Sequence, residues 1–192
     1  MPAYPAGEKT QPGTMDGVTR IIGIDPGSRI TGYGIIATRG PAMEFVACGT
    51  IRTGGQENFS ERLRLIHLGL CEVIVTHRPQ VAAVEDLFMA VNPRSALKLG
   101  QARGAAVLAA LLNDLRVYDY SPRVVKQAVA GYGQAEKSQV QHMVTMLLEL
   151  NKTPSSDAAD ALAVAICHAN TARFTDLNAP RPGKSCKRQF SR

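Results

Sequence analysis

The sequence predicts an α/β fold that forms one domain of this 192-residue chain. Three short strand-like runs lie between residues 21 and 52, and an amphipathic helix follows them. The helix leads into a continuously apolar segment, residues 81–84, which is typical of a strand covered on both faces. A helix that connects two strands in this way places them parallel in one sheet. We therefore expect a mixed sheet flanked by helices.

The first three strands are predicted from short apolar runs separated by turn sequences. Residues 21–24 are apolar and stop at the Asp-Pro-Gly sequence of residues 25–27, which is a good β-turn sequence. Residues 32–38 and 43–52 are two further strand-like runs, and the Arg-Gly-Pro sequence of residues 39–41 separates them. Tight turns between consecutive strands predict an antiparallel meander.

The helices are predicted from apolar residues at helical spacing. Phe59, Leu63, Ile66 and Leu70 form one apolar face of a helix that ends near Pro79. Four further helices are expected, over residues 95–113, 122–130, 136–150 and 156–170. A short strand at 117–118 is expected between the first two of them. The helix over 95–113 is dense in Ala and Gly, so another helix, of this chain or of a second subunit, could approach it closely.

The two ends of the chain are expected to lie outside the domain, which spans residues 19–172. Residues 1–18 are rich in Pro, Gly, Thr and Ala without an apolar period, which predicts a disordered extension, and Met15 is an alternative start. Residues 173–192 are expected to form a flexible basic tail. From Arg181 to Arg192 this tail holds five basic residues and no acidic one.

Charge and composition favour a nucleic-acid partner only weakly. The formal net charge is +6 at pH 7, but the tail carries most of it. The apolar runs are shorter than the roughly 18 residues that a membrane span needs, and the four cysteines lack the spacing of zinc ligands or of a disulfide framework. We expect a cytoplasmic protein that makes no membrane contact.

Four acidic residues are expected to meet at one edge of the sheet. Asp25 ends the first strand and Glu85 ends the buried strand, and the carboxyl edge is where open α/β sheets place their sites. Asp157 and Asp160 are three residues apart on a predicted helix, so their Cβ atoms lie roughly 5 to 6 Å apart on one face.

Clustered carboxylates require protonation, basic partners or bound cations, because they repel one another and lose hydration. Oxygen donors without His or Cys favour Mg²⁺ or Mn²⁺ over zinc. Two such ions, roughly 3.5 to 4 Å apart, would activate water and stabilise the leaving oxygen of a phosphodiester. Each acid alone also has a simpler interpretation: Asp25 as a turn former, Glu85 as a solvated strand end, Asp157 as an acid favoured by the helix dipole.

The sequence also contains four long segments: GIDPGSRITGYGII, VEDLFMAVNPRSALKLGQARG, VVKQAVAGYGQAEKSQVQHMV and DAADALAVAI. In order and spacing they resemble the four sequence blocks of the RuvC family of Holliday-junction resolvases. The resemblance covers about residues 20–170. It implies an RNase H-like fold with a five-stranded mixed sheet flanked by helices, in which the strand that ends at Glu85 lies beside the strand that ends at Asp25.

The resemblance also implies roles for individual residues. It assigns metal binding and catalysis to the four acids, Asp25, Glu85, Asp157 and Asp160, of which the last varies between Asp and His in the family. Lys126 and Lys137 match family lysines near the scissile phosphate; without the resemblance, both would be interpreted as solvated helix lysines. Lys137 also lies near a helix start, where backbone donors could meet a phosphate.

The segment after Glu85 is expected to contact DNA. The resemblance places Phe88 and Met89 against the centre of the junction, where an aromatic side chain could insert between bases. The alternative is that Phe88 folds back into the core. Asn92 and Arg94 are candidate DNA contacts, although Asn92 could equally serve only to start the helix.

The function that the resemblance implies is that of a structure-specific endonuclease of recombination and DNA repair. It would resolve Holliday junctions by symmetric, divalent-metal-dependent hydrolysis, and it would leave ligatable nicks. The implied partners are four-way junction DNA, a second copy of the chain packed on the Ala-rich helix, and the branch-migration proteins RuvA and RuvB.

Three other functions remain possible at this point. The first is an RNase H-like nuclease with another substrate, such as RNA in a hybrid, and the second is a junction-binding scaffold without catalysis. The third is an ATPase related to sugar kinases and actin, whose phosphate loop is similar to GIDPGS. A chain of 192 residues is too short to supply the second lobe of such an ATPase.

Overall fold

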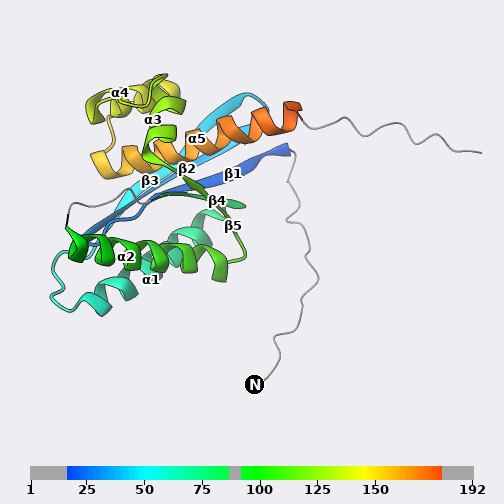
Figure 1. Cartoon of the computed structure of the whole chain (residues 1–192). Coiled ribbons are helices and arrows are strands. Elements are labelled where there is room, and N and C mark those ends of the chain that lie inside the picture. The colour runs from blue at the N-terminus through cyan, green and yellow to red at the C-terminus, as the bar shows by residue number, and fades with distance from the viewer. Residues whose placement is uncertain (1–16, 87–91, 179–192) are drawn as a thin grey trace, which may run out of the picture.

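The computed structural model describes residues 17–86 and 92–178, with side chains given up to residue 173, and it contains a five-stranded mixed sheet with helices on both faces (Figure 1). The strands, in the order β3-β2-β1-β4-β5 across the sheet, have these bounds along the chain: β1 Thr19–Asp25, β2 Ile30–Arg39, β3 Ala42–Arg52, β4 Val81–Glu85 and β5 Arg116–Tyr120. The helices are α1 Phe59–His77, α2 Pro93–Leu112, α3 Pro122–Ala130, α4 Lys137–Leu147 and α5 Ser156–Asn178.

The strand pairing confirms the topology expected from the sequence. Strands β1, β2 and β3 form an antiparallel meander, while β4 lies parallel to β1 and β5 lies parallel to β4. The helix α1 makes the crossover from β3 to β4, so the carboxyl ends of β1 and β4 reach the same edge of the sheet.

Two apolar clusters, one on each face of the sheet, hold the layers together. Helices α1 and α2 pack on one face, where Ile22, Ile24 and Val84 are fully buried. Helix α5 packs on the other face with Ile21 and Ala83, and α3 and α4 cover the outer side of α5 (Figure 1). Because neighbouring strand residues point to opposite faces, the odd-numbered residues of β1 and β4 all face α5.

Helix α5 lies unusually close to β1 and β2 because three glycines provide the space. A Cβ atom added to Gly23 would lie 2.0 Å from the carbonyl oxygen of Ala161, and one on Gly32 would lie 2.0 Å from that of Asp157. A Cβ atom on Gly34 would lie within 2.7 Å of Leu162. The glycines therefore let the helix backbone rest directly on the sheet.

Helix α5 is apolar on all sides because it lies between the sheet and two other helices. Its residues 161–167 are all fully buried. It continues to Asn178, past residue 170, where the sequence predicted the end of this helix. On that stretch the Nη2 atom of Arg173 donates to the carbonyl oxygen of Pro41 at 2.6 Å, which ties the helix to the β2–β3 turn.

The ends of α2 and α4 are set by capping. The side chain of Asn92 accepts a hydrogen bond from the backbone of Arg94 and begins α2, and Glu136 forms a capping box with Gln139 that begins α4. Helix α4 ends at Leu147, before the expected end at residue 150. In the described part of the chain, no helix is both long enough and apolar enough to cross a membrane.

The close approach of α5 predicts that Gly23→Ala will be strongly destabilising. Alanine normally suits a strand better than glycine, but here its methyl group would collide with the backbone of Ala161. We expect a loss of about 2 kcal/mol or more in the free energy of unfolding, measured by urea denaturation. Gly54→Ala, at a position with open space around it, is the matched control and should have little effect. Equal stabilities of the two variants would contradict this account of the packing.

Candidate active site

Two of the expected site residues, Asp25 and Glu85, lie side by side at the carboxyl edge of the sheet. The last register pair between β1 and β4 is Ile24 with Val84, and each acid is the next residue along its strand. Both acids follow the alternation of their strands, so they point to the face that α5 covers. Their carboxyl groups are hydrogen-bonded to each other.

The other two expected acids come from the start of α5. Gly32 is the register partner of Asp25 across β1 and β2, and its Cα lies against the backbone of Asp157. This contact brings the first turn of α5 to the end of β1. Asp157 and Asp160 are both close enough to Asp25 to raise its pKa. The four acids, which span 136 positions of the chain from 25 to 160, therefore gather at one place.

The environment of these acids favours their protonated forms. Burial is the largest cause that raises the pKa of Asp25 to about 6, followed by the negative charge of Asp160. Burial also raises the pKa of Glu85 to about 8, followed by the charge of Asp25. At neutral pH, the Asp25–Glu85 pair therefore holds a proton in the absence of a cation.

Lys137 is the cation of this site. It is the first residue of α4, and its Nζ atom lies 3.1 Å from Oδ2 of Asp160. The hydrogen bond to Asp160 raises the pKa of Lys137, and the lysine charge in turn lowers the pKa of Asp25 and Glu85. Lys126 lies on α3 with a half-buried side chain, and it forms no ion pair with the described residues. The structure thus brings Lys137 to the acids and does not bring Lys126 into contact with them.

The donor set fits a hard divalent cation, but the side chains are not preformed around one. Among the described residues, no three His, Cys, Asp or Glu side chains stand in an arrangement that could hold a metal ion. The carboxylate of Asp160 accepts a hydrogen bond from Lys137, and the carboxyl groups of Asp25 and Glu85 are hydrogen-bonded to each other. A divalent cation would nevertheless stabilise these buried, mutually repelling carboxylates. Its charge would take the place of the proton held by Asp25 and Glu85 and of the ammonium group of Lys137.

The expected DNA contacts are only partly placed by the structure. Phe88 and Met89 lie outside the described residues. Asn92 caps α2, which is the alternative that the sequence left open for it, and Arg94 is exposed in the first turn of the same helix. The sequence analysis missed Gly32, although Gly32 and Gly34 at alternate positions of one strand are a signal for close approach of another backbone.

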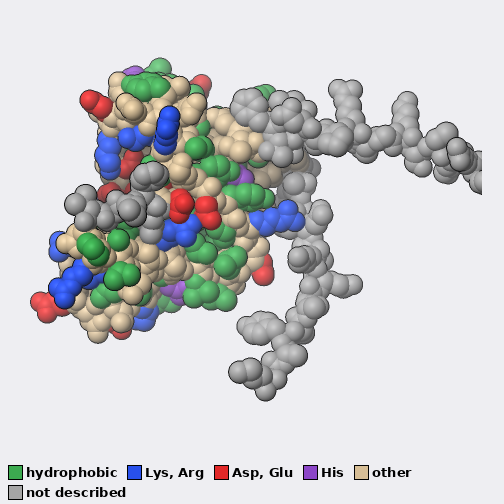
Figure 2. Space-filling model, in the orientation of Figure 1, with side chains coloured by type: hydrophobic (Ala, Val, Ile, Leu, Met, Phe, Trp, Pro, Cys, Tyr) green, Lys and Arg blue, Asp and Glu red, His purple; other side chains and the backbone are tan. Residues whose placement is uncertain are grey.

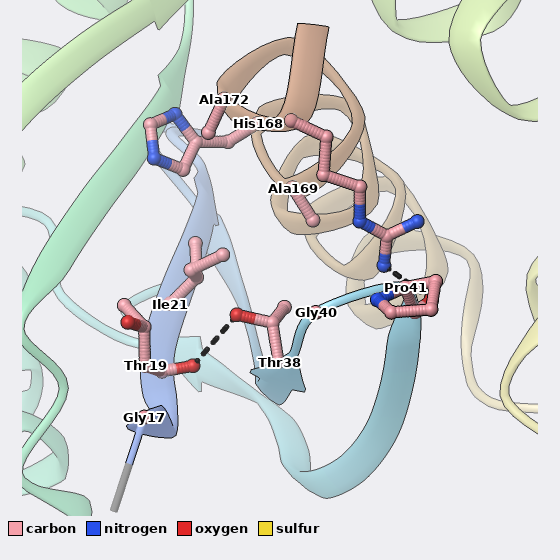
Figure 3. A pocket seen from close by; sticks show the side chains of 10 residues that line it. Gly17, Thr19, Ile21, Thr38, Gly40, Pro41, His168, Ala169 and Ala172 are labelled. Carbon is pink, nitrogen blue, oxygen red and sulfur yellow. Dashed lines mark hydrogen bonds between the residues drawn. The ribbon is translucent and has the colours of Figure 1, made fainter. Parts of the chain in front are cut away.

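A separate pocket of about 480 Å³ lies at the opposite edge of the sheet (Figure 3). Ile21, Ala169 and Ala172 are part of its lining, and Thr38 donates a hydrogen bond to the carbonyl oxygen of Thr19 on one side of it. The buried His168 also lines it and is hydrogen-bonded to Tyr120 at 2.7 Å. None of the four acids lines this pocket, so it is distinct from the acidic site.

Comparison with known proteins identifies the family. The family model described as "Crossover junction endodeoxyribonuclease RuvC" matches residues 21–168. The chain belongs to the RuvC family. A RuvC protein of Vibrio vulnificus is 54% identical over 151 residues, which cover 79% of this chain and 87% of that protein. A RuvC protein of Acinetobacter baumannii is 56% identical over 163 residues, or 83% of this chain and 90% of that protein.

Solved structures of RuvC proteins have the same fold. Thermus thermophilus RuvC in complex with a Holliday junction substrate is similar with a TM-score of 0.76 at 39% identity, and the match covers 81% of this chain and 96% of that one. A yeast mitochondrial Holliday junction resolvase, 11% identical, has a TM-score of 0.59 over 82% of each chain and supports the fold alone. These matches confirm the expected RNase H-like fold, and membership of the RuvC family confirms the expected nuclease class.

The raised pKa values predict that the metal-free protein loses stability as the pH rises. The ordinary pKa values of Asp25 and Glu85 are 3.8 and 4.5, so between about pH 4 and pH 8 the folded protein holds protons that the unfolded chain has released. The contribution of this acid pair to the free energy of unfolding, measured in EDTA, should therefore fall across this window, whereas the lowered pKa of buried His168 acts in the opposite direction and is common to all variants. In Glu85→Gln the fall should be shallower, whereas the exposed control Glu57→Gln should match the native slope. Parallel slopes for all three proteins would refute the shift.

Proposed function

We propose that this protein resolves Holliday junctions, and that Asp25, Glu85, Asp157 and Asp160 are its metal-binding catalytic residues. The observation that supports this most strongly is the meeting of four carboxylates from β1, β4 and α5 at the carboxyl edge of the sheet. A soluble fold would gain nothing from burying these acids together, because their repulsion and desolvation both cost free energy. A site for cations explains why they are there.

The chain's own residues prepare the site for a polyanionic substrate. When bound, two Mg²⁺ or Mn²⁺ ions would neutralise charge and supply an activated water for phosphodiester hydrolysis. Asp25, Glu85, Asp157 and Asp160 would hold these ions; Asp25 and Glu85 would then lose their shared proton to solvent, and Asp160 would give up its contact with Lys137. The ammonium group of Lys137 is then available to a phosphate oxygen beside the site.

Several groups around the acids suit contact with DNA. The side chain of Lys137 is 74% exposed although its end touches Asp160, so it can reach a backbone phosphate without burial. Lys126, on the neighbouring helix α3, is a second candidate for a phosphate contact. Arg94 in the first turn of α2 is a third. Phe88 and Met89 follow Glu85 closely in the sequence, and we propose that they insert at the branch point.

The exposed face of α2 supports a homodimer. Leu97, Leu108 and Leu111 are 67%, 50% and 54% exposed, and Gly104 between them has open space where a side chain would be. These positions recur at helical spacing, and Figure 2 shows hydrophobic side chains exposed over α2. A two-fold axis through this face would place two identical sites on two strands of a four-way junction and produce symmetric cuts that leave ligatable nicks.

The proposed reaction suggests the remaining partners and the compartment. The branch-migration proteins RuvA and RuvB are the partners that the family implies for recombination and repair. We propose that the protein acts with them in the cytoplasm, where junctions in chromosomal DNA arise.

Asp25→Asn tests the catalytic role directly. The amide keeps the size of the side chain but removes the charge that a cation needs, so cleavage of a mobile four-way junction in Mg²⁺ or Mn²⁺ should fall by roughly a thousandfold or more. Junction binding, measured by gel shift in Ca²⁺, should stay near the native value. Asp114→Asn, which changes an exposed loop acid, is the control and should cut normally. Native cleavage by Asp25→Asn would show that the catalytic site has been misassigned.

The same assay separates the alternative substrates. The native protein should cut a four-way junction much faster than a linear duplex or an RNA–DNA hybrid of the same sequence. Preference for the hybrid would instead indicate an RNase H activity. Junction binding without metal-dependent nicking would indicate a scaffold.

Charge introduced on α2 should break the dimer. A double variant, Leu108→Glu with Leu111→Glu, places two carboxylates on the proposed apolar interface. We expect the dimer dissociation constant to rise by roughly a hundredfold or more, measured by light scattering after size exclusion. Met146→Glu on α4, where the native side chain is 62% exposed, should leave the dimer intact. If the double variant stays dimeric and Met146→Glu becomes monomeric, the interface lies elsewhere than on α2.

A further inference from the structure

Arg103 on α2 forms an ion-pair bridge at the end of the strand that carries Glu85. Its Nη2 atom donates to Oδ1 of Asp119 on β5 at 2.5 Å and lies 3.7 Å from Oδ1 of Asp86, the residue that follows Glu85. One guanidinium group thus contacts acids on two neighbouring chain segments.

The bridge lies on the face of the sheet opposite the four acids. Val84 and Val117 belong to the cluster packed on α1 and α2, and by strand alternation Asp86 and Asp119 continue on that face. Glu85 and its register partner Tyr120 point the other way. The end of β4 therefore directs Glu85 toward the candidate active site and Asp86 toward α2.

Strand pairing also holds this end of β4, with β1 on one side and β5 on the other. Strand β5 is the edge strand and spans only Arg116–Tyr120. Beyond the register pair of Glu85 with Tyr120, the backbone N–H of Asp86 donates to the carbonyl oxygen of Tyr120 at 2.8 Å. Arg103 adds a side-chain bridge that joins both strand ends to a helix whose Ala102 and Ala106 are fully buried.

The bridge is more than an exposed surface ion pair. The side chain of Arg103 is only 22% exposed, whereas those of Asp86 and Asp119 are about half exposed. The Nε atom of Arg103 is buried without a hydrogen-bond partner among the described residues. A guanidinium group held at this desolvation cost, with two acids on one side of it, has little freedom to move.

We infer that Arg103 is a positioning residue for Glu85: by bridging Asp86 and Asp119 from behind, it fixes the end of β4 so that Glu85 meets Asp25. The inference rests on the proposed metal-binding role of Glu85. Arg103 touches neither the acids of the site nor, by this proposal, the substrate. Outer residues that orient metal ligands typically affect metal affinity or activity 10- to 100-fold when they are replaced.

Arg103→Met tests this role. It removes the bridge but keeps an apolar stem of similar length against α2. We expect Mn²⁺ affinity of the DNA-free protein, measured from the EPR signal of free Mn²⁺, to fall by about 10- to 100-fold. The junction dissociation constant in Ca²⁺ should change less than about threefold. Arg103→Lys keeps the positive charge but not the guanidinium group, and its Mn²⁺ affinity should lie between those of the native protein and Arg103→Met.

Two further variants distinguish positioning from simple loss of charge. Arg116→Met removes an exposed arginine at the far end of β5 and should bind Mn²⁺ like the native protein. In the Arg103→Met background, Asp86→Asn with Asp119→Asn removes the charges of the two acids that Arg103 contacts in the native protein. If positioning is the role, Mn²⁺ affinity stays low in this triple variant; recovery to the native value would overturn the inference.

Mn²⁺ binding by Asp25→Asn distinguishes a failure of the Arg103 role from a failure of the proposed metal site. If Asp25→Asn weakens Mn²⁺ binding and Arg103→Met does not, only the positioning role of Arg103 fails. If Asp25→Asn leaves Mn²⁺ binding unchanged, the proposed metal site itself fails. A lower melting temperature for Arg103→Met with native Mn²⁺ affinity would reduce Arg103 to a residue that stabilises the fold.

Discussion

The site depends on direct contact between the backbone of α5 and the strands β1 and β2. Glycines at positions 23, 32 and 34 remove the side chains that would otherwise separate helix and sheet. As a result, the first turn of α5 lies against the end of β1, where Asp25 is located. The parallel pairing of β1 with β4 then adds Glu85. Backbone packing, rather than any attraction between the acids, brings the four carboxylates together.

Electrostatics within the site opposes the fold that creates it. Burial and mutual repulsion raise the pKa of Asp25 and Glu85, and one lysine partly offsets the negative charge. On the opposite face of the same strand end, Arg103 contacts two more acids. The end of β4 therefore has a cation on each side: Lys137 on the face of the four acids and Arg103 on the opposite face. Such an arrangement offsets the negative charge of a strongly acidic strand end in the metal-free protein.

Sequence reasoning captured the fold because the relevant signals are local and repeated. Short apolar runs, the Asp-Pro-Gly turn and the crossover helix indicated the first four strands, and the family resemblance implied the five-stranded sheet. Acids at two strand ends and one helix start indicated the site. Family resemblance singled out Lys137, which the structure brings to Asp160. Arg103 could not be found in this way, because its partners lie 16 or more positions away in sequence and its role depends on side-chain packing. The contact of Asp160 with Lys137 likewise follows from competition between charges, which sequence spacing does not reveal.

The placement of Asp157 and Asp160 on the most deeply buried helix has an evolutionary consequence. Residues 161–167, directly after these acids, are fully enclosed by the sheet and by neighbouring helices. Few substitutions can be tolerated there without loss of the whole fold. The proposed catalytic acids of α5 are thus tied to the part of the protein least free to vary, while α2 and the surfaces near its start can diverge. New target preferences would accordingly arise at the periphery, with the chemistry inherited unchanged.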